Sequence, residues 1–152
     1  MANGGIMNIK GECLMIYDKI EFRADPFSYE LCFEDRITLV GGDSASGKTV
    51  LYGMLDDLKM TEPYKSIKLF NYRAENLKES LEKCENCFIV IDNADVLIDD
   101  EIRRFINFRF SNQYMLFLRN CDGLNVSANS FKVLKRHGYK IMLEEGGLEW
   151  RR

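Results

Sequence analysis

The sequence predicts an α/β fold, a three-layer sandwich with a mostly parallel sheet and an N-terminal antiparallel β segment. Two observations predict this class. Short apolar runs separated by turn residues fill the first third of the chain, and strand-like and helix-like segments alternate after Gly41. Strands that alternate with helices make right-handed crossovers, which place helices on both faces of a parallel sheet.

The first third of the chain is expected to form antiparallel strands and hairpins, and its β-rich part is assigned to residues 12–35. The apolar stretches lie at residues 13–17, 19–22, 29–33 and 36–40. Asp25-Pro26 and Glu34-Asp35 interrupt these stretches, and residues of these types favour turns.

The segment at residues 48–59 is the first predicted helix. Its apolar residues recur at the spacing of one buried helical face, at Val50, Leu51, Met54, Leu55 and Leu58. A strand is expected next at residues 67–70. A second helix is expected at residues 74–85, where one stripe is formed by Leu77, Leu81 and Cys84.

The second half of the chain continues the alternation. Residues 88–91 are apolar throughout, which is typical of a parallel strand covered on both faces. Asp99 or Asp100 can cap the helix that follows. The remaining expected elements are a strand at residues 114–118, a helix at residues 127–136 that ends at Gly138, and a last strand at residues 139–143.

Composition and charge narrow the class of function. The 152 residues carry a formal net charge of −3, which does not indicate a nucleic-acid surface, although a local basic patch stays open. No apolar run approaches the roughly 20 residues of a membrane span, and the N-terminus lacks the order of a signal peptide. The expected location is the cytoplasm. Without a repeat or linker, residues 1–152 are expected to form one domain, with the β-rich N-terminal part followed by a core at residues 36–144.

Cysteine usage agrees with that location. The chain has five cysteines, an odd number, mostly in apolar surroundings, which fits a reducing compartment. Cys84 and Cys87 form a C-x-x-C pair, but a structural zinc site needs a second pair of ligands. Packing is therefore favoured over zinc or redox chemistry for this pair.

One stretch carries a motif with a chemical meaning. Residues Gly42-Asp43-Ser44-Ala45-Ser46-Gly47-Lys48-Thr49 fit G-x-x-x-x-G-K-[ST], between a predicted strand and a predicted helix. Glycines let successive N–H groups point into one concavity, and the helix N-terminus adds positive potential. Lys48 is expected to contact the β- and γ-phosphates and Thr49 to ligate Mg²⁺. We expect these residues, with Val50, to bind the nucleotide; the alternative is a turn with a solvated lysine.

This motif resembles Walker A, and the chain resembles the P-loop NTPases from about residue 35 to residue 143. The resemblance implies ATP and Mg²⁺ as cofactors. It also implies a second motif, Walker B, an apolar strand that ends in an aspartate on the magnesium side. The run at residues 87–91 followed by Asp92 matches this motif. Thr49 and Asp92 are thus the expected metal-side residues.

The residues after Asp92 resemble a segment of AAA-type ATPases and related helicases. Ile91-Asp92-Asn93-Ala94-Asp95-Val96-Leu97 is similar to I-D-E-A-D-x-L, with asparagine in place of the catalytic glutamate. That glutamate polarises the attacking water, whereas the Asn93 amide cannot accept a proton. The resemblance implies slow hydrolysis with binding largely intact. Asp95, Glu101 or a partner's carboxylate can replace the glutamate.

Polar residues also follow the strand expected at residues 114–118. Asn120 lies where AAA-type proteins carry sensor 1, and the resemblance implies a contact with the γ-phosphate or the attacking water. Arg119 can contact a phosphate instead. The alternative is an ordinary polar pair at a strand end.

Other features of the sequence differ from those of known subfamilies of P-loop NTPases. In ATP-binding heads of ABC-type proteins an upstream aromatic stacks on adenine, a role open to Tyr17, Phe27 or Tyr29, although a core position is favoured. No LSGGQ-like signature is present, and the sequence ends soon after the last expected strand, so no AAA lid is expected. The absence of N-K-x-D favours ATP over GTP. Three arginines lie on or near the helix after Asp92, namely Arg103, Arg104 and Arg109. They can act as an arginine finger toward a neighbouring molecule, bind nucleic acid, or face solvent, and the last role is favoured.

Together these patterns predict a Mg-ATP-binding protein with slow or partner-dependent hydrolysis, coupled to assembly or conformational state. The partner can be further copies of the same chain, which would form a homo-oligomer, or a different protein. Two alternatives remain. The chain can be a competent ATPase that uses Asp95 or a partner's base, or a small-molecule or nucleotide kinase built on the same phosphate-binding core.

Overall fold

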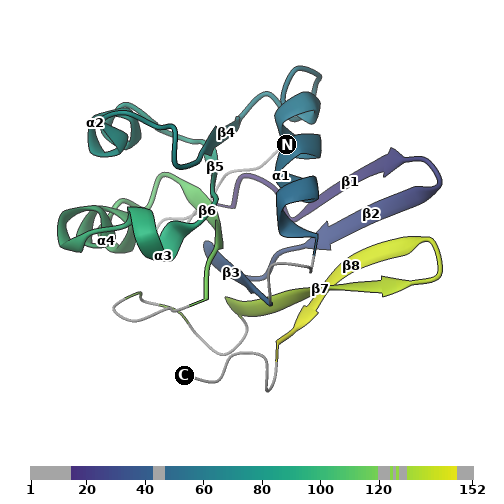
Figure 1. Ribbon diagram of the computed structural model, residues 1–152. Coiled ribbons are helices and arrows are strands. Elements are labelled where there is room, and N and C mark those ends of the chain that lie inside the picture. Colours follow the sequence, from purple (N-terminus) through teal and green to yellow (C-terminus); the bar gives the residue numbers. More distant parts are fainter. Residues whose placement is uncertain (1–14, 43–46, 120–123, 125, 127–129, 147–152) are drawn as a thin grey trace.

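The computed structural model describes residues 15–42, 47–119, 124, 126 and 130–146 (Figure 1). Its strands are β1 (Lys19–Ala24), β2 (Phe27–Cys32), β3 (Ile37–Gly41), β4 (Ile67–Phe70), β5 (Phe88–Ile91), β6 (Gln113–Phe117), β7 (Phe131–His137) and β8 (Lys140–Glu145). Its helices are α1 (Lys48–Leu58), α2 (Leu77–Glu82), α3 (Ala94–Leu97) and α4 (Asp100–Phe108). Among the described helices, none has the length and apolarity needed to cross a membrane.

All of the described strands join one eight-stranded sheet in the order β1-β2-β8-β7-β3-β6-β5-β4. The strands from β7 to β4 in this order pair in parallel. The hairpins β1–β2 and β7–β8 are antiparallel, and β2 pairs with β8 in parallel. The α/β class is therefore confirmed, with a mixed sheet. β6 lies between β3 and β5, although it follows both in the sequence.

The central strands carry a hydrophobic core on each face. On one face, Leu39, Ile91 and Leu116 pack with buried residues of α2, α3 and α4. On the other face, Val40 and Val90 pack with buried residues of α1, and this core extends to β1 and β2. Figure 1 shows α1 apart from the group formed by α2, α3 and α4. Helices therefore cover both faces at the centre of the sheet.

Several predicted elements are confirmed closely. The strands expected at residues 67–70 and 88–91 are β4 and β5, and the helix expected at residues 48–59 is α1. Asp99 caps α4, with its Oδ1 accepting the Ile102 N–H at 2.9 Å. The second helix is shorter than predicted because Asn76 has a left-handed backbone, φ 55°, so that α2 begins only at Leu77. Residues 15–17 form no strand.

The helix predicted at residues 127–136 is wrong. Residues 127–129 lie outside the described part, but Phe131–His137 is strand β7. Gly138, at φ 65°, lies with Tyr139 in the turn to β8, and His137 pairs with Lys140 across it. Glycine at positive φ serves both helix ends and two-residue hairpin turns. Gly138 was therefore compatible with both the end of a helix and the turn of a hairpin.

Candidate functional site

Three segments distant in the sequence meet at one small cavity. Its volume is about 80 Å³, and it is lined by Lys48, Thr49, Asp92, Asn93, Asp95, Phe117, Leu118 and Arg119. These residues begin α1 after β3, follow β5, and end or follow β6. The three strands are parallel, so their carboxyl ends meet at one edge of the sheet. Ligands of open α/β sheets bind at such edges.

The backbone around the first glycines takes conformations that favour glycine. Gly42 has φ 108° and Gly47, the N-cap of α1, has φ 94°. A Cβ on Gly47 would meet no atom within 4 Å, so the backbone angle rather than space selects glycine there. Lys48 Nζ donates a hydrogen bond to the Gly42 carbonyl oxygen at 2.7 Å. The lysine side chain therefore lies across the two ends of the glycine-rich segment.

The other residues of this motif differ in whether they line the cavity. Thr49 is exposed on the first turn of α1 and lines the cavity. Val50 is 57% exposed and is not among the residues that line it. Four residues that the sequence predicts to bind nucleotide lie outside the described residues, namely Asp43, Ser44, Ala45 and Ser46.

Asp92 and Asn93 form a tight connection from β5 to α3. The Asp92 N–H donates to the Phe70 carbonyl oxygen at 2.9 Å, which continues the β4–β5 pairing to the edge of the cavity. Asp92 Oδ1 accepts the Asn93 N–H at 3.0 Å. Asn93 has φ 52° and is the N-cap of α3. Asparagine is one of the few residues besides glycine that is common in this left-handed region.

Asp95 and Arg119 link α3 to the end of β6. Asp95 Oδ2 accepts the Arg119 N–H at 3.4 Å, and both residues line the cavity. Glu101, the other nearby candidate base, does not line it and instead pairs with Lys78 at 3.1 Å. Asn120, the expected sensor 1 residue, lies outside the described residues. Asp95 is thus the carboxylate best placed to act beside Asn93.

Tyr52 is a neighbour of this site that the sequence analysis missed. Burial, and then the carboxylates of Asp56 and Asp92, raise the pKa of Tyr52 to about 12. Its hydroxyl keeps its proton at neutral pH, and the charge of Asp92 contributes the smallest of these three effects on its pKa. The available signal was its spacing, since residues four apart on a helix, such as Lys48 and Tyr52, share one face.

The aromatic candidates for adenine stacking are engaged elsewhere, and none lines the cavity. Tyr17 donates its hydroxyl to the Pro63 carbonyl at 2.7 Å and packs on Phe88. Tyr29 is buried and stacks on Phe22, with ring centroids 4.7 Å apart. Phe27 lies under the Arg136 guanidinium. Their contacts are those of packing residues.

The arginines and cysteines singled out in the sequence also lie away from the cavity. Arg103 pairs with Asp100, and Arg109 lies 4.6 Å from the centre of the Phe105 ring. Cys84 and Cys87 are buried, and burial raises the pKa of the Cys84 thiol to about 11. The described residues contain no group of three His, Cys, Asp or Glu side chains placed to hold a metal ion. The cysteine pair is part of the core.

The donors at the cavity fit Mg²⁺ bound together with phosphates. Magnesium is usually held by one or two protein oxygens plus phosphate oxygens and water, so a larger cluster of protein ligands is not needed. The Thr49 hydroxyl and the Asp92 carboxylate provide such oxygens, and the Lys48 ammonium provides a positive charge for phosphate. At about 80 Å³ the cavity is well below the roughly 300 Å³ of a pocket for a drug-sized ligand. A cavity of this size has room for a phosphate group but not for a whole nucleotide.

Comparisons of the chain with protein-family models, curated proteins and solved structures return no match. The interpretation of the site accordingly depends on its own residues and their geometry.

Proposed function

We propose that the protein is a P-loop nucleotide-binding protein that binds Mg-ATP, hydrolyses it slowly or with a partner's help, and uses bound nucleotide to set an assembly or conformational state. One observation carries the proposal. Lys48 and Thr49 of the first motif line the same cavity as Asp92 of the second, although some 40 residues separate the two motifs. Chance matches to two short motifs would not be expected to converge in space.

The sheet provides independent support. The strand that precedes the glycine-rich segment, β3, is separated from the strand that precedes Asp92, β5, by β6. The end of β6 therefore reaches the cavity between the two motifs, where Arg119 lies. In this arrangement Lys48 neutralises phosphate charge, and Thr49 and Asp92 hold the metal. When bound, Mg²⁺ supplies charge neutralisation of the phosphate oxygens.

Slow hydrolysis follows from the residue at position 93. A general base must accept a proton from the attacking water, and a side-chain amide cannot do so at neutral pH. Asn93 lines the cavity, so it can orient a water molecule there. The competent ATPase remains a second candidate because Asp95 also lines the cavity. The kinase receives no comparable support, since the described residues that line the cavity do not include Arg103, Arg104 or Arg109.

The test is to incubate the purified protein with labelled ATP and Mg²⁺ for about an hour and to identify the nucleotide that stays bound. We expect intact ATP. We further expect Lys48→Ala to weaken ATP binding by about tenfold or more, because a charge-assisted contact is lost. Lys78→Ala, an exposed lysine on α2, is the matched control. Unchanged ATP affinity in Lys48→Ala would overturn the proposal, and bound ADP with released phosphate would favour the Asp95 alternative.

A further inference from the structure

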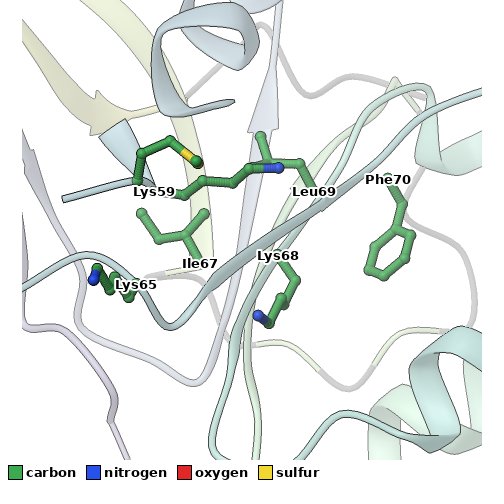
Figure 2. A pocket seen from close by; sticks show the side chains of 7 residues that line it. Lys59, Lys65, Ile67, Lys68, Leu69 and Phe70 are labelled. Atoms are coloured by element: carbon green, nitrogen blue, oxygen red, sulfur yellow. The ribbon is translucent and has the colours of Figure 1, made fainter. Parts of the chain in front are cut away.

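A second cavity, of about 460 Å³, lies along β4 (Figure 2). β4 is the last strand of the sheet in the described part of the chain, with β5 as its single neighbour. The cavity is lined by the residues of this strand together with Lys59, Met60 and Lys65. It therefore follows an open edge of the sheet and lies apart from the cavity that contains Lys48.

Part of the backbone of β4 faces away from β5 at this edge. The carbonyl oxygens of Ser66 and Phe70 accept N–H groups from the β5 side, each at 2.9 Å. Because backbone groups alternate in direction along a strand, those of Ile67 and Leu69 point away from β5. The Ile67 N–H donates to the Tyr64 carbonyl oxygen at 3.2 Å. Within the described part of the chain, no strand lies beside the Ile67 carbonyl and the two backbone groups of Leu69, so an added strand can pair with them.

The side chains at this edge are basic and apolar. Lys59, Lys65 and Lys68 line the cavity, and no acidic residue does. Lys59 pairs with Asp56 at 2.8 Å and Lys65 with Glu62 at 3.7 Å, but such exposed pairs are weak and exchange partners easily. Ile67 and Leu69 face the core that α1 covers and give the cavity an apolar side. The edge thus combines positive charge with apolar surface and open backbone groups.

We propose that β4 docks an extended acidic segment of a partner protein, which adds a strand beside β4. Such a segment has both the N–H donors and the carbonyl acceptors that the edge requires, and its carboxylates complement the three lysines. A nucleic acid backbone presents acceptors without N–H donors, so it matches the lysines but not the strand. This docking edge is additional to the nucleotide site, and docking there does not require ATP to be bound.

The first test measures the fluorescence anisotropy of a labelled peptide of seven residues, alternating glutamate and valine, as full-length protein is added at low salt. We expect saturable binding. The double variant Lys65→Glu/Lys68→Glu is expected to weaken it by about tenfold or more, because two attractions become repulsions. Arg23→Glu, a charge reversal on the opposite edge strand β1, is the matched control and should leave it unchanged. Circular dichroism checks that the variants are folded.

The second test uses the unaltered protein and so does not depend on variant folding. A peptide whose central valine is replaced by proline lacks one N–H donor and is expected to bind about tenfold more weakly. Hydrogen exchange at the Leu69 amide should slow when the original peptide is bound. The proposal is overturned if the original peptide does not bind, if the proline peptide binds equally well, if Arg23→Glu weakens binding as much as the double variant, or if a single-stranded oligonucleotide is the preferred occupant.

Discussion

Asn93 shows how one backbone angle limits the chemistry of the cavity. Its φ of 52° lies in the left-handed region, which costs most residues about 1–2 kcal/mol and costs asparagine less. The Asp92 carboxylate fixes this conformation by accepting the Asn93 N–H. Asparagine is therefore favoured here by the turn itself, quite apart from any effect on hydrolysis.

We expect Asn93→Glu to separate these two effects. Glutamate should lower the free energy of unfolding by about 1 kcal/mol because of the left-handed backbone, and raise ATP turnover by about tenfold or more because it adds a base. Urea unfolding and phosphate release measure the two quantities. Asn93→Gly, which tolerates the backbone angle, should do neither. Faster turnover in the glycine variant would show that Asn93 itself restrains hydrolysis.

At the residue scale, short-range patterns singled out residues from two motifs that line one cavity. Lys48, Thr49 and Asp92 were identified because phosphate and magnesium chemistry demands particular residue types at particular spacings. Tyr52 was missed because its nearness to Asp92 depends on how α1 lies on the sheet, which no local pattern specifies. Val50 was included for its place beside the motif, yet its side chain does not line the cavity.

At the element scale, the β7–β8 hairpin depends on Gly138. This glycine joins the two strands at φ 65°, and β8 in turn joins the N-terminal hairpin to the sheet through β2. The strands near the centre of the sheet could be predicted because uniformly apolar runs leave few alternatives. The prediction failed at residues 131–136 because their mixture of apolar and basic residues fits either a helix or a strand, and Gly138 can end both.

The two glycines Gly138 and Gly53 make a matched pair for testing this interpretation. Neither would place a new Cβ within 4 Å of another atom, so packing is unchanged in both. Gly138→Ala is expected to destabilise the protein by about 1 kcal/mol because alanine disfavours positive φ. Gly53→Ala, in α1, is expected to stabilise it by about 0.5–1 kcal/mol. Equal effects of the two substitutions on the urea midpoint would contradict this interpretation of the turn.

At the scale of the whole molecule, the cavity is assembled by the strand order. β3, β5 and β6 are adjacent in the sheet but are connected through helices on both faces, so the cavity exists only when the central sheet is complete. Ligand bound there should therefore oppose unfolding of the sheet as a unit. The sequence predicted the alternation of elements but not that β6 lies between the other two strands, because that order is set by tertiary packing.

Mg-ATP at about one hundred times its dissociation constant is expected to raise the free energy of unfolding by about 2.7 kcal/mol. Urea unfolding followed by circular dichroism measures this increment with and without Mg²⁺. Asp92→Asn should lose the part of this increase in the free energy of unfolding that requires Mg²⁺. Asp95→Asn also changes a carboxylate at the cavity but should keep that magnesium-dependent part. A full magnesium increment in Asp92→Asn would remove Asp92 from the metal side.

The hydrogen bond from the Asp92 N–H to the Phe70 carbonyl has a consequence for how the molecule could respond to a partner. β4 is the strand between the open edge of the sheet and β5, and its last residue, Phe70, holds the backbone of Asp92. A strand added outside restrains β4, and through this bond it also restrains the backbone of Asp92. Any such coupling is reciprocal, because binding free energies around a closed cycle must balance. If the docked segment tightens ATP binding, ATP must tighten the hold on that segment by the same factor.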